Sequence, residues 1–364
     1  MLARQRRPLS MYATPLLKKN KLDKAFSECD TQQQLEELVL SASKYDFNSW
    51  NVMTAFSRLG RLLKPTNDAV YAKLLEIERD MRRPEAGEQK FSQHELETIA
   101  TGVALGPLAS KLPPFVVKGF LQLPSFAEFT PNALTNLSYA TGKLKHVDFE
   151  LEGKLISELV DKRGELKDFS PNQLSVLAQT LGWWYTEANT QLPPTTSKDS
   201  YGRDVRLPDP VSMTKRDELF AKLTTALVAN SDALTGNQLA NALNGTLRVG
   251  YSGAELFDFA CQKFDVSKLA KTQEITNLLR AVAEKKPTHS SEFVEKLAPV
   301  LTKFHNQFTP KQIQSVFASL AALGWSTPQS KPVLKVLKKE VARRGLEEHL
   351  DAEALQQSFA KLSL

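Results

Sequence analysis

Apolar and polar positions along this chain follow a helical period, and one pattern of them recurs. An apolar residue is followed by Ser or Thr, often by Pro, then by Gln or Glu, and then by apolar residues at spacings of three and four. Such spacings predict an amphipathic helix with one buried face. The clearest copies begin at Phe91, Phe129, Phe169, Leu234 and Phe308. Each copy therefore predicts where a helix starts and which side of it is buried.

The polar residues of this phrase match the chemistry of a helix N-terminus. A Ser or Thr hydroxyl at the N-cap accepts a hydrogen bond from a backbone N–H that the first turn leaves unpaired. A Gln or Glu three residues later completes a capping box, with Ala133 as the exception here. The N-cap residues are Ser92, Thr130, Ser170, Thr235 and Thr309. Gly142 and Gly182 stand where such a helix would end in a left-handed residue.

Weaker copies extend the series to eight. The apolar starts fall at residues 47, 91, 129, 169, 234, 270, 308 and 350, so six of the seven steps lie near 40 residues. A step of this length holds two helices and two short turns. The second helices are predicted at residues 67–81, 114–121, 149–161, 215–229, 254–264, 291–304 and 331–344. We therefore expect an all-α fold, an α-solenoid of about eight helix-turn-helix repeats over residues 23–364.

One step is 65 residues long and contains an insertion. Residues 185–213 are rich in Pro, Ser, Thr and Asp and lack a helical apolar stripe, which predicts a loop. Insertions in a repeat array emerge on one face, often the binding face. The loop is either part of such a face or a tolerated surface segment.

Charge is unevenly distributed along the chain. The first 22 positions hold six of the 47 Lys and Arg residues and no Asp or Glu, which leaves 41 cations against 41 anions in the rest. The repeat body is therefore formally neutral. The basic start, residues 1–22, is interpreted either as an organellar targeting segment or as a basic arm that becomes ordered on a partner.

Several classes of protein are disfavoured by the composition. No apolar run approaches the roughly 18–20 residues of a membrane span, and strand signals are scarce. Cys29 and Cys261 fall in different predicted repeats, which indicates reduced thiols.

The sequence also lacks the motifs of common active sites. Its histidines are scattered singly, no glycine-rich phosphate loop follows a strand, and no nucleophile-elbow motif occurs. We therefore expect a protein that is not an enzyme, with no catalytic residue, no metal, no cofactor and no small-molecule substrate.

Local basic clusters are candidate nucleic-acid contacts. Lys335, Lys339 and Arg343 form one i, i+4 row on a predicted helix, and Arg4, Arg6 and Arg7 lie in the basic start. These six residues are the candidate RNA contacts. Further cations end other predicted helices, where they either line up along the array or complement the helix dipole. These further cations are Arg58, Arg61, Lys64, Lys143, Lys145, Arg280, Lys285 and Lys286.

Three tryptophans follow the predicted helix ends. Trp183, Trp184 and Trp325 could stack on bases, but the junction between adjacent repeats offers them an apolar site.

The phrase FSPNQLSVLAQTLG at Phe169, its copies, and FNSWNVMTAFSRLGRLL at Phe47 resemble organellar helical-repeat proteins of the heptatricopeptide and octotricopeptide class. They also resemble the helical regions of RAP-domain proteins. The resemblance covers about residues 22–364 and implies an α-solenoid in mitochondria or plastids that works on RNA. The chain departs from RAP-domain proteins because it ends in a helical phrase without the RAP tail.

Taken with the neutral repeat body, the resemblance favours a structural or assembly component of an organellar ribonucleoprotein, in the first place the mitochondrial ribosome. Its partners would be rRNA or other RNA and neighbouring proteins, and its location the mitochondrial matrix, with a plastid as the alternative. Phosphate neutralisation supplies most of the affinity for RNA, which a neutral solenoid supplies poorly. A free-standing RNA-binding factor for transcript processing or stability, and a scaffold subunit of a protein-only mitochondrial complex, are the competing functions.

Overall fold

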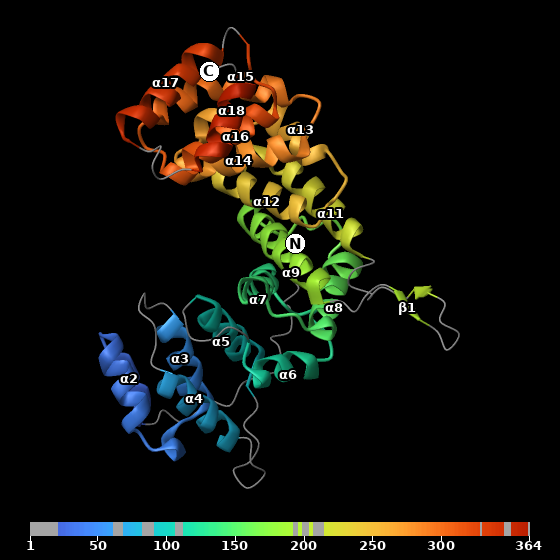
Figure 1. The fold of residues 1–364 in the computed structure, drawn as a ribbon. Coiled ribbons are helices and arrows are strands. Elements are labelled where there is room, and N and C mark those ends of the chain that lie inside the picture. Colours follow the sequence, from blue (N-terminus) through green and yellow to red (C-terminus); the bar gives the residue numbers. More distant parts are fainter. Residues whose placement is uncertain are drawn as a thin grey trace, which may run out of the picture. The chain divides into compact units, whose positions relative to one another are not determined.

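The computed structural model describes residues 21–60, 68–81, 91–105, 112–191, 196–198, 204–206, 215–327, 330–345 and 351–362. Apart from one short β-hairpin, the fold of these residues consists of helices that pack in neighbouring pairs (Figure 1), which confirms the all-α prediction. The chain divides into two compact units, residues 1–108 and residues 109–364. Among the described helices, none is long and apolar enough to cross a membrane. Cys29 and Cys261 are buried free thiols.

The first unit is organised around one helix. Its described elements are α1 (Lys21–Glu28), α2 (Gln32–Ser41), the 3₁₀ turn η1 (Lys44–Asp46), α3 (Ser49–Gly60), α4 (Asp68–Met81) and α5 (Gln93–Leu105). α3 packs against α5 and also contacts α1, α2 and α4. The apolar stripe Val52, Ala55, Phe56 and Leu59 forms its buried side, as the helical spacing predicts.

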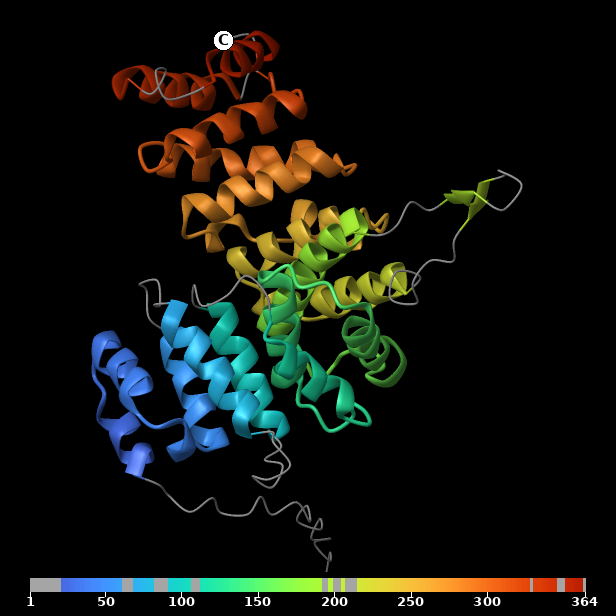
Figure 2. The same ribbon diagram turned by 60° about the horizontal axis from the view of Figure 1, so that its bottom comes forward.

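The second unit contains two rows of helices. Figure 2 shows its successive helix pairs stacked one upon another, most clearly in the part of the chain coloured yellow to red. The first-row helices begin at the phrases: α7 (Pro131–Lys143), α9 (Pro171–Gln191), α12 (Gly236–Arg248), α14 (Thr272–Lys285), α16 (Pro310–Ala322) and α18 (Ala352–Lys361). The second-row helices are α6 (Pro114–Gln122), α8 (Phe149–Ser157), α11 (Arg216–Ala229), α13 (Glu255–Gln262), α15 (Ser290–Phe304) and α17 (Ser330–Arg343). A π-helical turn, η3 (Glu158–Lys162), extends α8, and the 3₁₀ turns η4 (Ser231–Ala233) and η5 (Val266–Lys268) precede α12 and α14. Within each row, helices that follow one another in sequence are in contact, except that α11 contacts the η3 turn at the end of α8.

The insertion differs from the predicted loop in two places. α9 continues to Gln191, so residues 185–191 are helical, because buried Trp184 and Tyr185 extend the apolar side of the helix. Further on, β1 (Thr196–Lys198) and β2 (Asp204–Arg206) form an antiparallel hairpin in which Ser197 pairs with Val205. Residues 192–195, 199–203 and 207–214 lie outside the described part of the chain.

The predicted helix caps are confirmed. Thr235 and Thr309 each form a full capping box with Gln238 and Gln312, in which the hydroxyl accepts from the Gln N–H at 3.3 Å. Ser170 accepts from Gln173 N at 3.3 Å and donates its own N–H to the Gln173 side chain at 2.9 Å. The equivalent bonds form at Ser92, and Thr130 caps α7 alone. The apolar residue before each of these caps in the second unit is buried.

Removing a cap should weaken the fold measurably. Ser170→Ala or Thr309→Ala is expected to lower the free energy of unfolding by about 0.5–2 kcal/mol, because the first turn loses an N–H acceptor. Urea denaturation followed by circular dichroism measures this change. Ser252→Ala, which alters an exposed loop serine, is the matched control. Unchanged midpoints for both cap variants would contradict the capping interpretation.

The prediction that Gly142 and Gly182 end their helices is wrong. Both lie inside a helix, and each faces the backbone of the next first-row helix: a Cβ at Gly142 would lie 2.4 Å from Thr180 O, and one at Gly182 would lie 2.7 Å from Gly245. The left-handed residues come later, as at Lys145, whose φ is 50°. These glycines therefore permit close approach of helix backbones rather than helix termination.

Candidate nucleic-acid interface

The predicted basic row lies on α17. Val333, Leu334, Leu337 and Val341 form the buried side of this helix, which packs against α15. Lys335, Lys339 and Arg343 lie on the opposite, exposed side, and Lys331 precedes them by one turn in the same i, i+4 row. The structure therefore places the three predicted residues together on one exposed helix face.

These cations differ in how they are paired. Arg343 donates from Nε and Nη2 to the two carboxylate oxygens of Glu340, at 2.8 and 2.6 Å. Glu340 is 4 % exposed, and this bond with Arg343 lowers its pKa. Lys335 and Lys339 have no ion pair or hydrogen bond to any residue the structure describes. Of the three predicted residues, the two lysines therefore hold the uncompensated charge.

Other predicted cations have different places. Arg4, Arg6 and Arg7, and likewise Arg61 and Lys64, lie outside the described residues. Arg280 donates to Asn244 Oδ1 at 2.7 Å, and Lys145 lies 3.9 Å from Glu187. Lys286 caps α14 in a left-handed conformation, and Lys143 is exposed. Of the cations in this group that the structure describes, Arg280 and Lys145 therefore have partners within the fold.

A recurrent bond from a cation to a backbone carbonyl explains several of the basic residues. In each case the acceptor lies 29 to 37 residues earlier, in most cases at or just beyond the end of a helix. There the unpaired carbonyls and the helix dipole both favour a cation. The pairs are Arg58 with Phe26 and Cys29, Lys154 with Phe120, Leu121 and Leu123, Arg163 with Phe126, Ala127 and Phe129, Lys285 with Tyr251 and Ser252, Lys296 with Cys261 and Gln262, and Arg344 with Phe308. These side chains therefore stabilise the fold through hydrogen bonds between elements.

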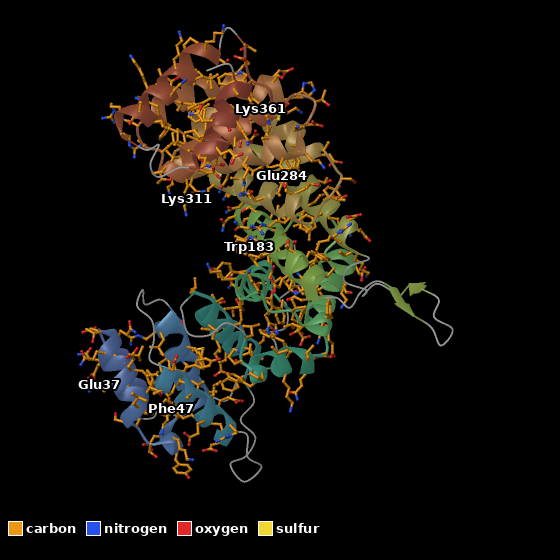
Figure 3. All side chains as sticks on the ribbon, in the orientation of Figure 1. Glu37, Phe47, Trp183, Glu284, Lys311 and Lys361 are labelled. Atoms are coloured by element: carbon orange, nitrogen blue, oxygen red, sulfur yellow. The ribbon has the colours of Figure 1, made fainter. Side chains whose placement is uncertain are left out.

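Two of the three tryptophans are core residues. Trp184 is fully buried, with its ring 6.1 Å from Phe149 and 4.9 Å from Tyr185. Trp325 is 3 % exposed and donates from Nε1 to Glu295 at 2.8 Å. Trp183 is half-buried on α9 and is labelled in Figure 3. The packing interpretation thus holds for Trp184 and Trp325.

One carboxyl group lies in the core of the second unit. Glu152 on α8 is 0 % exposed, and neither of its oxygens has a hydrogen-bond partner among the residues described. Burial raises its pKa to about 8; Asp148 acts in the same direction, and the Thr141 hydroxyl beside it acts in the opposite one. That hydroxyl donates to the carbonyls of Leu137 and Ser138, at 3.2 and 3.0 Å. A fully enclosed carboxyl cannot meet a substrate, so Glu152 bears on stability.

In the described part of the chain, no group of three or more His, Cys, Asp and Glu side chains is arranged to hold a metal ion. Comparison of the sequence with models of known protein families and with curated proteins finds no match.

Proposed function

We propose that this protein is a non-enzymatic helical-repeat component of an organellar ribonucleoprotein, in the first place the mitochondrial ribosome. In this proposal the helix pairs continue as an α-solenoid of about eight repeats with a period near 40 residues. Residues 1–22 address the protein to the matrix or contact RNA there. The protein meets rRNA through basic side chains and neighbouring proteins through the rest of its surface.

The observation that carries the RNA part of the proposal is the unpaired state of Lys335 and Lys339. Many other cations donate hydrogen bonds to backbone carbonyls, whereas these two lie on the exposed side of α17 without a carboxylate partner. Two or three lysines neutralise only a few phosphates, which gives weak and salt-dependent attraction. Such a contact suits a protein held in a large particle by many partners better than a free-standing RNA binder.

Replacing both lysines tests this contact. In Lys335→Ala/Lys339→Ala, association with the ribonucleoprotein should weaken, and the slope of log affinity against log salt should fall by about 1 for each lost phosphate contact. The measurement is the fraction that co-sediments with the particle over a series of salt concentrations. Lys263→Ala/Lys271→Ala removes the same charge from two other exposed positions and is the matched control. Arg343 stays unchanged because its loss would strip buried Glu340 of its closest cation.

Sedimentation of an organelle lysate with and without RNase separates the three functions. Co-migration with ribosomal subunits that RNase abolishes supports the proposal. A fast complex that resists RNase and lacks rRNA would favour a protein-only scaffold. Slow sedimentation with one crosslinked transcript would favour a free-standing RNA-binding factor.

A further inference from the structure

The exposed side of α17 carries charge of one sign only. Seven residues of this helix are exposed, and five of them are cations, which we name the α17 cation face. The single acid of the helix, Glu340, lies on the buried side. The cations are Lys331, Lys335, Lys338, Lys339 and Arg343, and the other two exposed residues are Pro332 and Ala342.

The helix dipole does not explain the position of these cations. A helix N-terminus favours acids and disfavours cations in its first turn. The second-row helices α8, α11, α13 and α15 each have Asp or Glu in the first turn, and α6 has no charge there. α17 has no acid in its first turn and has Lys331 instead. This helix therefore departs from the rule that the rest of its row follows.

The lysines also repel one another. Lys331, Lys335 and Lys339 are four residues apart in turn, and like charges at this spacing destabilise a helix. Lys338 lies over the Phe359 ring of α18, with Nζ 4.9 Å from the ring centroid, and Arg343 is paired with Glu340. A surface that opposes two local rules at once is expected at a functional site, where a partner compensates. The row of three lysines therefore calls for an anionic partner.

The side chains that the face lacks narrow the class of that anion. Single-stranded RNA is bound largely by aromatic side chains on which its bases stack. The exposed side of α17 has no aromatic, amide or hydroxyl side chain, so it can contact phosphates but offers nothing on which a base can stack. It also has no exposed Leu, Phe or Trp, the side chains with which an interfacial helix enters a membrane.

Charge density favours a double helix over a single strand. Neutralising one phosphate releases about 0.9 counterion from duplex DNA and about 0.7 from a single strand, so a contact made by cations alone gains more on a duplex. A duplex also holds its phosphates in fixed positions, and α17 holds its cations along a straight line of about 18 Å. Binding then orders neither partner further, which limits its entropic cost.

We propose that the α17 cation face binds the phosphate backbone of double-helical RNA without regard to its sequence. This inference rests on the RNA contact proposed above, and it names the form of RNA that makes the contact.

Anisotropy titration of the full-length protein with fluorescein-labelled RNA tests the inference. The probes are two short duplexes of unrelated sequence and an oligouridine with the same number of nucleotides. Both duplexes should bind equally and, at 0.1 M salt, about fourfold more tightly than oligouridine, because three contacts differ by about 0.6 in salt slope. In Lys335→Ala/Lys339→Ala, the salt slope for the duplex should fall by about 2, and binding should weaken more than tenfold.

Two controls separate binding from folding. Lys263→Ala/Lys271→Ala, which removes two exposed lysines elsewhere, should bind the duplex as the parent protein does. Urea denaturation of Lys335→Ala/Lys339→Ala should give a midpoint equal to that of the parent or higher, because repulsion within the row is relieved.

The outcomes that contradict the inference differ from those that contradict the proposed function. If no RNA binds, or if Lys335→Ala/Lys339→Ala binds the duplex as the parent does, the α17 contact with RNA itself fails. If oligouridine binds as tightly as the duplexes and the double variant weakens both equally, the RNA contact stands and the duplex assignment fails. If oligoglutamate of equal charge displaces the duplex as well as unlabelled duplex does, the face is a site for acidic polypeptides instead.

Discussion

Gly245→Ala is expected to destabilise the second unit by about 3 kcal/mol, because overpacking between helices typically costs 1–3 kcal/mol and occasionally more. A Cβ atom at this position of α12 would lie 2.1 Å from Ala178 O and 2.8 Å from Gln179 N on α9. Both are backbone atoms, so no side chain can rotate away. The two helices would have to separate, and the buried side chains around them would lose contacts.

Gly153→Ala is the matched control for this substitution. Gly153 also lies within a helix, but a Cβ there meets nothing within 4 Å. Alanine should therefore stabilise the protein by about 0.5–1 kcal/mol, since it reduces the freedom of the unfolded chain. Urea denaturation followed by circular dichroism gives both values. If the two variants shift the midpoint in the same direction, the close approach of α9 and α12 is not supported.

The second large effect concerns buried Glu152 and pH. Its folded pKa of about 8 lies above the model-peptide value near 4.3, so the folded protein holds a proton that the unfolded chain releases. The stability that this proton supports is fully present below about pH 4 and falls as the pH rises toward 8. The slope is at most about 1.4 kcal/mol per pH unit. Glu152→Gln keeps the shape without the ionisation, so it should flatten this slope.

The free energy of unfolding, measured at intervals between pH 5 and pH 8, checks this expectation. Near pH 5 the variant and the parent protein should differ little, and by pH 8 the variant should be more stable by a few kcal/mol. Glu150→Gln, on the exposed side of the same helix, serves as the control and should follow the parent curve. Parallel curves for the parent and Glu152→Gln would show that the carboxyl reaches solvent or a cation.

Local chemistry explains why the helix starts were predictable. A cap such as Thr309 acts on an N–H three residues away, and the stripe Ile313, Val316, Phe317 and Leu320 repeats within one helix. Both signals are complete within about a dozen residues. The helix that begins at Pro310 needed no information from distant parts of the chain.

Features that depend on a second helix could not be read in this way. A glycine near a helix end suits either a left-handed turn or a backbone crossing, and the presence of Gly245 opposite Gly182 decides between them. The helix beyond residue 184 was missed for the same reason. Trp184 and Tyr185 are buried because they pack against Phe149 and Phe220, which lie on other helices and are not visible in the local sequence pattern. Tertiary partners, not local spacing, set these outcomes.

In the candidate site, too, the local features could be predicted from the sequence and those that depend on distant residues could not. The row of Lys335, Lys339 and Arg343 follows from helical spacing alone, and Glu340 three residues before Arg343 was a visible partner. The carbonyls that Arg163 and Lys296 bind lie 34 to 37 residues away and have no sequence signature.

The cation-to-carbonyl bonds also bear on how the second unit is assembled. Each bond from Lys154, Arg163, Lys285, Lys296 or Arg344 reaches back fewer than forty residues, and helices contact their neighbours within a row. A chain leaving the ribosome can therefore close each bond soon after its donor emerges, without waiting for the C-terminus. Folding can proceed by growth along the rows, which avoids the entropic cost of closing long loops.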